Sequence, residues 1–213
     1  MVWLKEAIST SIGKKMTMAV TGLSFCGFLT VHLLGNLTIY GGGDAFNTYA
    51  EKLHALGGIL TIAELGMLFF AIVHMTTGLL LFYQNWKARP VSYAVKKNAG
   101  GQNIGSATMP YTGILVLVFV VVHLLNFSFA DKTGTTIFNI VSLAFSNPLY
   151  VIAYILGMII VAVHIRHGFW SAFQTIGANH PKYMPFIRGF SVLFGVIIGI
   201  GFGSLPIYIS LIS

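Results

Sequence analysis

Four histidines lie inside the long apolar stretches of this sequence, one in each of the first four stretches. They are His32, His74, His123 and His164. An imidazole nitrogen can ligate a metal, relay a proton or bond to a neighbouring helix. Ionisable side chains are costly in hydrocarbon and usually functional there. Four at once therefore favour a shared chemical role over four independent hydrogen bonds.

The spacing of the histidines predicts two pairs at two membrane depths. His32 and His123 lie about 15 to 16 residues into their stretches, which is roughly 23 Å at the rise of an α-helix. His74 and His164 lie equally far into stretches that run in the opposite direction. We therefore expect an outer pair, His32 with His123, and an inner pair, His74 with His164, roughly 15 Å apart by helical rise.

An internal repeat supports this pairing, because segments of the first half recur about 90 residues later. The matching segments are Thr21-Gly22 with Thr112-Gly113, Val31-His32-Leu33-Leu34 with Val122-His123-Leu124-Leu125, and Val73-His74 and Gly78 with Val163-His164 and Gly168. Two-helix repeats keep their orientation across the membrane, so a pseudo-twofold axis along the membrane normal should relate them. That axis would bring the two members of each histidine pair face to face.

Small residues recur on the same helical faces as the histidines. They are Thr21, Thr112, Gly78 and Gly168. Small side chains let helices, or a bulky ring, approach the backbone closely. Their joint placement predicts two cavities stacked along one axis.

Two facing imidazoles in an apolar bundle suit the axial positions of a six-coordinate haem iron. Zinc and copper are poorly served by two-ligand sites so far apart. No Cys-x-x-Cys-His stretch is present to attach haem covalently, and Cys26 is the single cysteine. The pattern predicts two non-covalent b haems, with the four histidines as iron ligands, and hence a route for electrons across the bilayer.

The elements that must position these residues are transmembrane helices. The 213 residues are 56% hydrophobic and 8% charged, which excludes soluble and disordered classes. The apolar stretches are 16–40, 58–84, 108–129, 149–173 and 187–211. We predict an all-α integral membrane protein, one domain over 1–213, with a four-helix bundle core holding two b haems plus a fifth helix. The segment 41–57 is expected to be an outer loop.

The charge distribution predicts the orientation of the chain. All basic residues except Lys52 and Lys132 fall on one side of the predicted spans. They are Lys5, Lys14, Lys15, Lys87, Arg89, Lys96, Lys97, Arg166, Lys182 and Arg188. The positive-inside rule then places the N-terminus in the cytoplasm and the C-terminus outside. The expected location is the inner membrane of a bacterial or archaeal cell.

With these features the chain resembles the di-haem cytochrome b membrane anchor of succinate dehydrogenase and fumarate reductase. The resemblance rests on one histidine in each of the first four of five spans and on two further stretches. These are Gly43-Asp44-Ala45-Phe46-Asn47 and His164-x-x-x-Gly168-Phe169-Trp170-Ser171. It implies that His32 and His123 hold the outer haem and that His74 and His164 hold the inner one.

The resemblance also implies partners and a lipid substrate. Members of the family work in the respiratory chain and the tricarboxylic acid cycle with a flavoprotein subunit and an iron–sulfur subunit on the cytoplasmic face. Four basic residues form either a docking surface for the iron–sulfur subunit or a topology signal alone. They are Lys87, Arg89, Lys96 and Lys97. Single-chain, five-span members imply menaquinone as the quinone.

Several residues are candidates beside the haems. Reduction of a quinone by two electrons takes up two protons, so a quinone site needs proton-exchanging groups. Glu64 is the first candidate, followed by His54 and Glu51, and the alternative for Glu64 is an interfacial carboxylate bonded to a neighbouring helix. Arg166 either neutralises an inner-haem propionate or marks topology.

Two other functions fit parts of the pattern. A di-haem cytochrome b could anchor another dehydrogenase, such as a hydrogenase or a formate dehydrogenase. A transporter could instead use the histidines to relay protons, and it would then be colourless. We expect no succinate or fumarate site on this chain in any of these cases.

Overall fold

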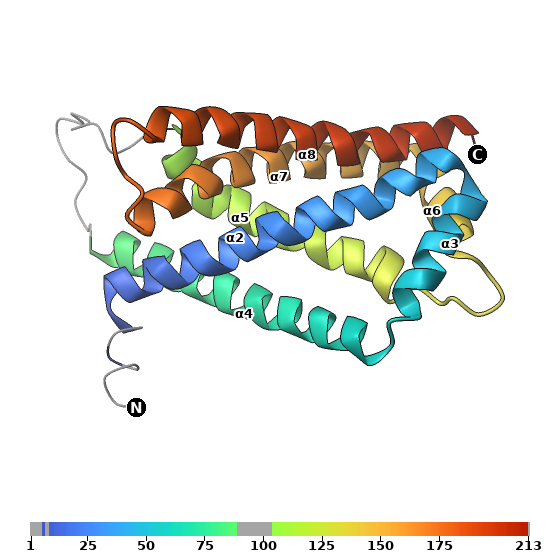
Figure 1. Cartoon of the computed structure of the whole chain (residues 1–213), viewed down its shortest axis with the longest axis horizontal. Helices are drawn as coiled ribbons and strands as arrows, with labels where there is room; N and C mark the ends of the chain where they lie inside the picture. The colour runs from blue at the N-terminus through green and yellow to red at the C-terminus, as the bar shows by residue number, and fades with distance from the viewer. Residues whose placement is uncertain (1–5, 7–8, 89–103, 213) are drawn as a thin grey trace.

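The computed structural model describes residue 6, residues 9–88 and residues 104–212. Lys5, Arg89, Lys96 and Lys97, which the charge argument uses, lie outside the described residues. The described chain is helical, and within it no strand occurs. The start of α2 (Ser11–Asn36) and the end of α8 (Met184–Ile212) lie at opposite ends of the long axis (Figure 1).

Within the described ranges, five helices are long and apolar enough to cross a membrane. They are α2 (Ser11–Asn36), α4 (Gly58–Lys87), α5 (Ile104–His123), α7 (Pro148–Thr175) and α8 (Met184–Ile212). The five predicted spans are confirmed, and most begin or end a few residues beyond the predicted bounds. Thr10 sets the start of α2, where its hydroxyl accepts the Gly13 N–H at 2.9 Å. The Asn147 side chain caps α7 in the same way, with Pro148 at the first helical position.

The segment 41–57 was expected to be a loop, but most of it is helical. A 3-10 turn, η1 (Leu37–Gly41), leads into α3 (Gly43–His54). Gly42 has a φ of +92°, which lets the chain turn sharply between the two. Phe46 and Ala50 are buried one helical turn apart, so the segment has one apolar face.

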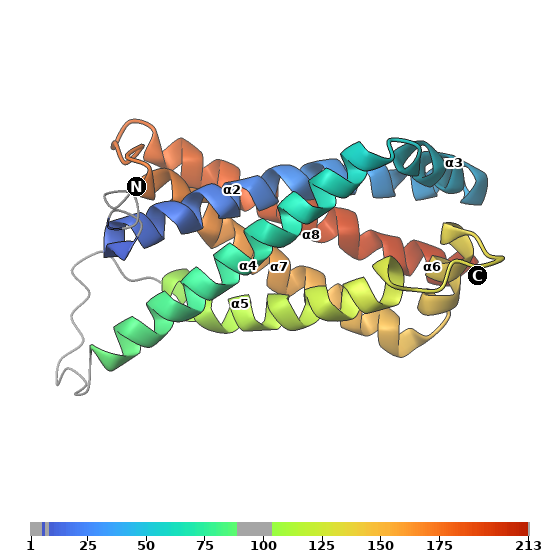
Figure 2. The same ribbon diagram turned by 90° about the horizontal axis from the view of Figure 1, so that it is seen from below.

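A second short helix, α6 (Ile137–Phe145), packs beside α3 at the end of the molecule that holds the C-terminus (Figures 1 and 2). The Asn47 side-chain oxygen accepts the backbone N–H of Phe138 at 3.0 Å. A methyl group at Gly43 would approach the Phe138 ring to 2.9 Å, so only glycine fits there. The helices α3 and α6, which are far apart in sequence, thus pack together at one end of the molecule.

Helices α7 and α8 make the most extensive contact of the molecule. Two glycines one helical turn apart on α8 permit it. A methyl group at Gly195 would lie 3.0 Å from the Ala162 carbonyl oxygen, and one at Gly199 would lie 2.9 Å from the Ala162 Cβ. Small residues spaced in this way bring helix backbones together in lipid. The fifth span is therefore tightly integrated with the bundle.

Packing is uneven across the bundle. One buried cluster joins Leu33 of α2 and Ile198 of α8 to the α7 residues Met158, Val161 and Ile165. Helix α4, by contrast, has no buried residue and forms the edge opposite α8 in Figure 1. Figure 2 shows α4 crossing in front of the other helices. The helices therefore pack tightly around α7 and loosely around α4.

Candidate functional site

The outer pair meets as the repeat predicts. The ring centroids of His32 on α2 and His123 on α5 lie 6.0 Å apart, with the ring planes at 87°. Two nitrogen–metal bonds of about 2 Å place the centroids of two axial imidazoles roughly 6 Å apart. The observed separation therefore suits two rings that share one metal between them.

The inner pair lies on α4 and α7. His74 and His164 are near enough to interact electrostatically. Each ring also contacts a threonine of the neighbouring helix. The Nδ1 atom of His74 lies 2.9 Å from the Thr21 hydroxyl, and the Nδ1 atom of His164 lies 3.1 Å from the Thr112 hydroxyl. Thr21 and Thr112 therefore lie at the level of the inner pair.

Glycines line the inner pair in the same symmetrical way. A methyl group at Gly22 would lie 3.3 Å from the Cε1 atom of His74, and one at Gly113 would lie 3.5 Å from that of His164. Farther along, a methyl group at Gly78 would lie 3.4 Å from the methyl carbon of Met18, and one at Gly168 would lie 3.8 Å from that of Met109. Every one of these contacts has its counterpart in the other half of the repeat.

Aromatic rings surround the outer pair. Phe28 stacks on His32 at 5.1 Å and 13°, and Phe119 stacks on His123 at 6.0 Å and 25°. Polar partners differ between the two histidines. The Asn36 amide nitrogen lies 3.4 Å from His32 Nδ1, whereas His123 Nδ1 is buried with no hydrogen-bond partner among the described residues.

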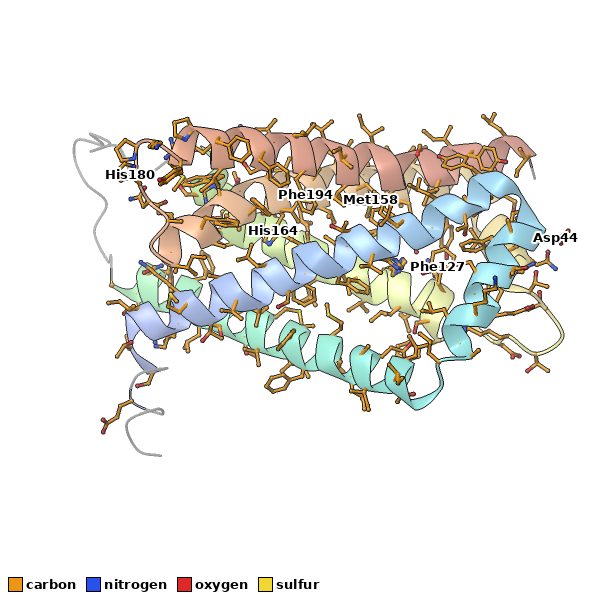
Figure 3. All side chains as sticks on the ribbon, viewed as in Figure 1. Asp44, Phe127, Met158, His164, His180 and Phe194 are labelled. Atoms are coloured by element: carbon orange, nitrogen blue, oxygen red, sulfur yellow. The ribbon has the colours of Figure 1, made fainter. Side chains whose placement is uncertain are left out.

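The two pairs lie at different levels. In Figure 3, His164 lies toward the end marked by His180, while Phe127 lies toward the end marked by Asp44. The Phe127 ring is 5.3 Å from the His123 ring, so it marks the outer pair. This arrangement agrees with the depth argument.

The donor set suits haem better than a bare metal ion. Among the described residues no three His, Cys, Asp or Glu side chains gather to hold an ion, so each histidine pair offers two protein ligands. A haem brings four nitrogen donors of its own and needs two more. The 6.0 Å spacing of the outer rings fits a pair that is incomplete without a central group.

The remaining predicted residues are not brought together. Glu64 is exposed on α4, and Glu51 and His54 are exposed on α3. His54 Nδ1 lies 2.7 Å from the Ala50 carbonyl oxygen of its own helix. Arg166 is exposed and its Cβ faces Gly195 of α8, whereas His164 faces α5. The roles suggested for these four residues stay predictions.

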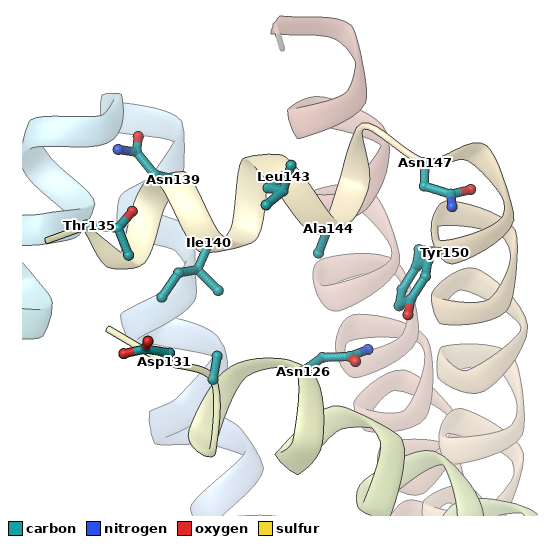
Figure 4. A pocket seen from close by; sticks show the side chains of 10 residues that line it. Asn126, Asp131, Thr135, Asn139, Ile140, Leu143, Ala144, Asn147 and Tyr150 are labelled. Atoms are coloured by element: carbon teal, nitrogen blue, oxygen red, sulfur yellow. The ribbon is translucent and has the colours of Figure 1, made fainter. Parts of the chain in front are cut away.

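A cavity of about 700 Å³ lies at the end of the bundle near α6, between the π-helix η2 (Leu124–Ser128) with the segment after it, α6 and the start of α7 (Figure 4). Its lining consists of Asn126, Ala130, Asp131, Thr135, Asn139, Ile140, Leu143, Ala144, Asn147 and Tyr150. The Asp131 carboxylate at its rim accepts the backbone N–H of Thr133 at 2.9 Å, which lowers the pKa of Asp131. The cavity therefore combines one carboxylate with amide, hydroxyl and apolar side chains.

Two residues connect this cavity to the outer pair. Asn126 donates a hydrogen bond to the Tyr154 hydroxyl at 3.1 Å, and the Tyr154 ring lies 6.2 Å from the His123 ring. Neither residue is singled out by the sequence argument. One signal was available, because Tyr154 occupies in the second half of the repeat the position that Glu64 occupies in the first.

A comparison with known proteins gives one similar relative. The succinate dehydrogenase cytochrome b558 subunit of Bacillus subtilis is 26% identical over 156 residues, which cover 70% of this chain and 72% of the relative. The chain is similar to a succinate dehydrogenase cytochrome b subunit. The resemblance drawn from the histidine pattern is thereby confirmed. No family model and no solved structure matches the chain.

The stretches that carried the resemblance to the cytochrome b anchor have structural roles here. Phe46 and Asn47 join α3 to the core and to α6. At the other end of the molecule, Trp170 contacts the His167 ring at 4.9 Å and the Arg188 guanidinium at 4.8 Å. The contacts of Trp170 tie α7 to the start of α8. Such contacts keep the ends of the helices, and so the histidines between them, in position.

Proposed function

We propose that this chain is the membrane anchor and electron-transfer subunit of a succinate:quinone oxidoreductase or quinol:fumarate reductase. Electrons would pass between a cytoplasmic iron–sulfur subunit and a membrane quinone through two b haems. The observation that supports this most directly is the pair of imidazoles, His32 and His123, facing each other at 6.0 Å inside an apolar bundle.

Each histidine has one role in this proposal. His32 and His123 are the axial ligands of the outer haem, and His74 and His164 are those of the inner haem. When bound, the haems supply one-electron redox chemistry, and with both axial positions taken they transfer electrons without binding oxygen. The chain itself orients the four rings and keeps water out of the sites.

The basic end of the bundle is proposed as the docking face for the iron–sulfur subunit, which in turn carries the flavoprotein. Lys14 and Lys87 lie at this end, at the start of α2 and the end of α4. The Lys14 ammonium donates a hydrogen bond to the Gln84 side chain at 3.1 Å, which joins the two helices there. The positive-inside rule puts this face in the cytoplasm.

The quinone, which we take to be menaquinone, is proposed to exchange electrons and protons at the outer end. Glu64 is the first candidate for proton exchange, with His54 and Glu51 after it. The cavity lined by Asn126 is a second location, since its volume is within the range of small-molecule sites. Electron transfer across the full membrane would then respond to the membrane potential by about 2.3 kcal/mol per charge per 100 mV.

The test is purification of the complex from native membranes, followed by visible spectroscopy and activity measurements. The proposal predicts a Soret band, two haems with separate midpoint potentials, and succinate oxidation or fumarate reduction coupled to a quinone. A colourless protein would favour the proton-relay transporter. Copurification with a hydrogenase or a formate dehydrogenase would favour the anchor of another enzyme.

A further inference from the structure

We infer that Thr21 and Thr112 are positioning residues that hold the inner histidines in the tautomer able to bind iron. The inference rests on the proposed haem function and adds to it the means by which each inner ligand is prepared. The hydroxyl contacts to His74 Nδ1 at 2.9 Å and to His164 Nδ1 at 3.1 Å carry the inference.

The direction of these hydrogen bonds follows from counting protons. A hydroxyl has one hydrogen. The Thr21 hydroxyl is placed to donate its hydrogen to the Thr17 carbonyl at 2.7 Å, and we therefore assign it as the acceptor at His74. The proton of a neutral His74 ring is therefore on Nδ1, and the lone pair is on Nε2.

The second half of the molecule gives the same result independently. The Thr112 hydroxyl lies 3.2 Å from the Thr108 carbonyl and 3.1 Å from the Met109 carbonyl, so its hydrogen is taken by the backbone of its own helix. Its lone pair then accepts the Nδ1–H of His164. Nε2 of His164 is left unprotonated, as a metal ligand must be.

Burial protects the contact at Thr21. Thr21 is 4% exposed, so water does not compete for its hydroxyl. Because the glycine that follows each threonine lies against the histidine ring, the ring can approach the hydroxyl. Second-shell partners of this kind fix the ring orientation and raise the basicity of the ligand.

Among the described residues the outer pair has no threonine hydroxyl in this place, and His32 Nδ1 lies 3.4 Å from the Asn36 amide nitrogen instead. His123 Nδ1 is buried and without a hydrogen-bond partner among the residues described, and no hydroxyl takes the corresponding place at His32. A more basic ligand stabilises oxidised iron, so the two hydroxyls should lower the midpoint potential of the inner haem and leave the outer haem unaffected.

The experiment replaces the hydroxyls in the intact complex with Thr21→Val and Thr112→Val, and restores them with Thr21→Ser and Thr112→Ser. Valine keeps the shape of threonine without the hydroxyl. The control is Thr30→Val on the same helix as Thr21, because the Thr30 hydroxyl donates to the Cys26 carbonyl at 2.9 Å and contacts no histidine. Redox titration of the visible bands, low-temperature EPR and haem content are measured.

In the valine variants we expect the inner-haem potential to rise and its EPR signal to shift. The affinity for the inner haem should fall roughly ten- to a hundredfold. The outer haem should keep its wild-type signals, and the serine variants and Thr30→Val should match wild type. A serine variant that assembles where the valine variant does not also supports the inference.

Unchanged inner-haem signals in the valine variants would overturn the positioning role and leave the proposed function intact. Serine and valine variants that are perturbed alike, including a shared failure to assemble, would also overturn it, because packing and not the hydroxyl would then be responsible. A wild-type complex without haem would overturn the proposed function, and this inference with it.

Discussion

The inner and outer histidine pairs have the same ligand type but different surroundings. The inner histidines lie within the uninterrupted helices α4 and α7, and each contacts a threonine hydroxyl. The outer histidines lie near helix ends. Helix α2 ends four residues after His32, and α5 ends at His123, where the π-helix η2 (Leu124–Ser128) begins.

The comparison shows two ways to position a ligand in an apolar bundle. Hydrogen bonds that recur in both halves of the repeat orient the inner rings. Aromatic stacking orients the outer rings, with Phe28 on His32 and Phe119 on His123. Two haem sites that each use two histidines would therefore differ in midpoint potential.

The largest expected effect comes from removing a ligand. His74→Ala or His164→Ala should abolish the inner haem alone, and His32→Ala or His123→Ala the outer haem alone, because a six-coordinate iron needs both axial ligands. Haem content and redox titration of each variant measure this. Two intact haem signals in any of the four variants would show that the pairing is wrong.

The next effect separates the two candidate locations of the quinone. Glu64→Gln should lower quinone-linked turnover roughly a hundredfold if Glu64 exchanges protons, since general acid–base groups contribute at least that much.

Asn126→Leu should raise the KM for quinone roughly tenfold if the cavity binds quinone. The leucine removes an amide that lines the cavity and that donates a hydrogen bond to the Tyr154 hydroxyl. Steady-state kinetics with a soluble quinone analogue and an unchanged haem spectrum distinguish the two. A normal KM in Asn126→Leu would remove the cavity from consideration.

A smaller effect tests aromatic support of the outer pair. Phe119→Leu should destabilise the chain by about 2 kcal/mol, because the Phe119 ring packs on His123, Tyr154 and Gly157. Phe28→Leu should cost about 1 kcal/mol or less, since Phe28 is 42% exposed. Thermal unfolding gives both values, and EPR should show changes in the outer haem alone. A shift of the inner-haem signal would contradict the separation of the sites.

The smallest effect probes the approach of helix α2 to His74. A methyl group added by Gly22→Ala lies 3.3 Å from the His74 ring, so a shift of a few tenths of an ångström should perturb the inner-haem EPR signal slightly. Gly27→Ala, at a position with no atom within 4 Å, is the matched control and should leave both haems unchanged. Equal effects of the two changes would argue against close approach at Gly22.

Much of the candidate site followed from spacing along the chain. The rise of an α-helix predicted the four histidines at two depths, and the repeat paired His32 with His123, whose rings lie 6.0 Å apart. The packing of α3 against α6 could not be inferred in this way. Its stability comes from contacts between segments about 90 residues apart, such as that between Asn47 and Phe138, which no local pattern encodes.

The sequence by itself determined the class of protein, the five spans and the two histidine pairs, because hydrophobic length and helical period are local properties. Only the tertiary structure decided which groups surround each pair. The direction of the Thr21 and Thr112 hydrogen bonds, the unpartnered Nδ1 of His123 and the link from Asn126 through Tyr154 depend on how helices approach one another. That approach is set by interlocking side chains from different helices, which periodicity along one helix does not specify.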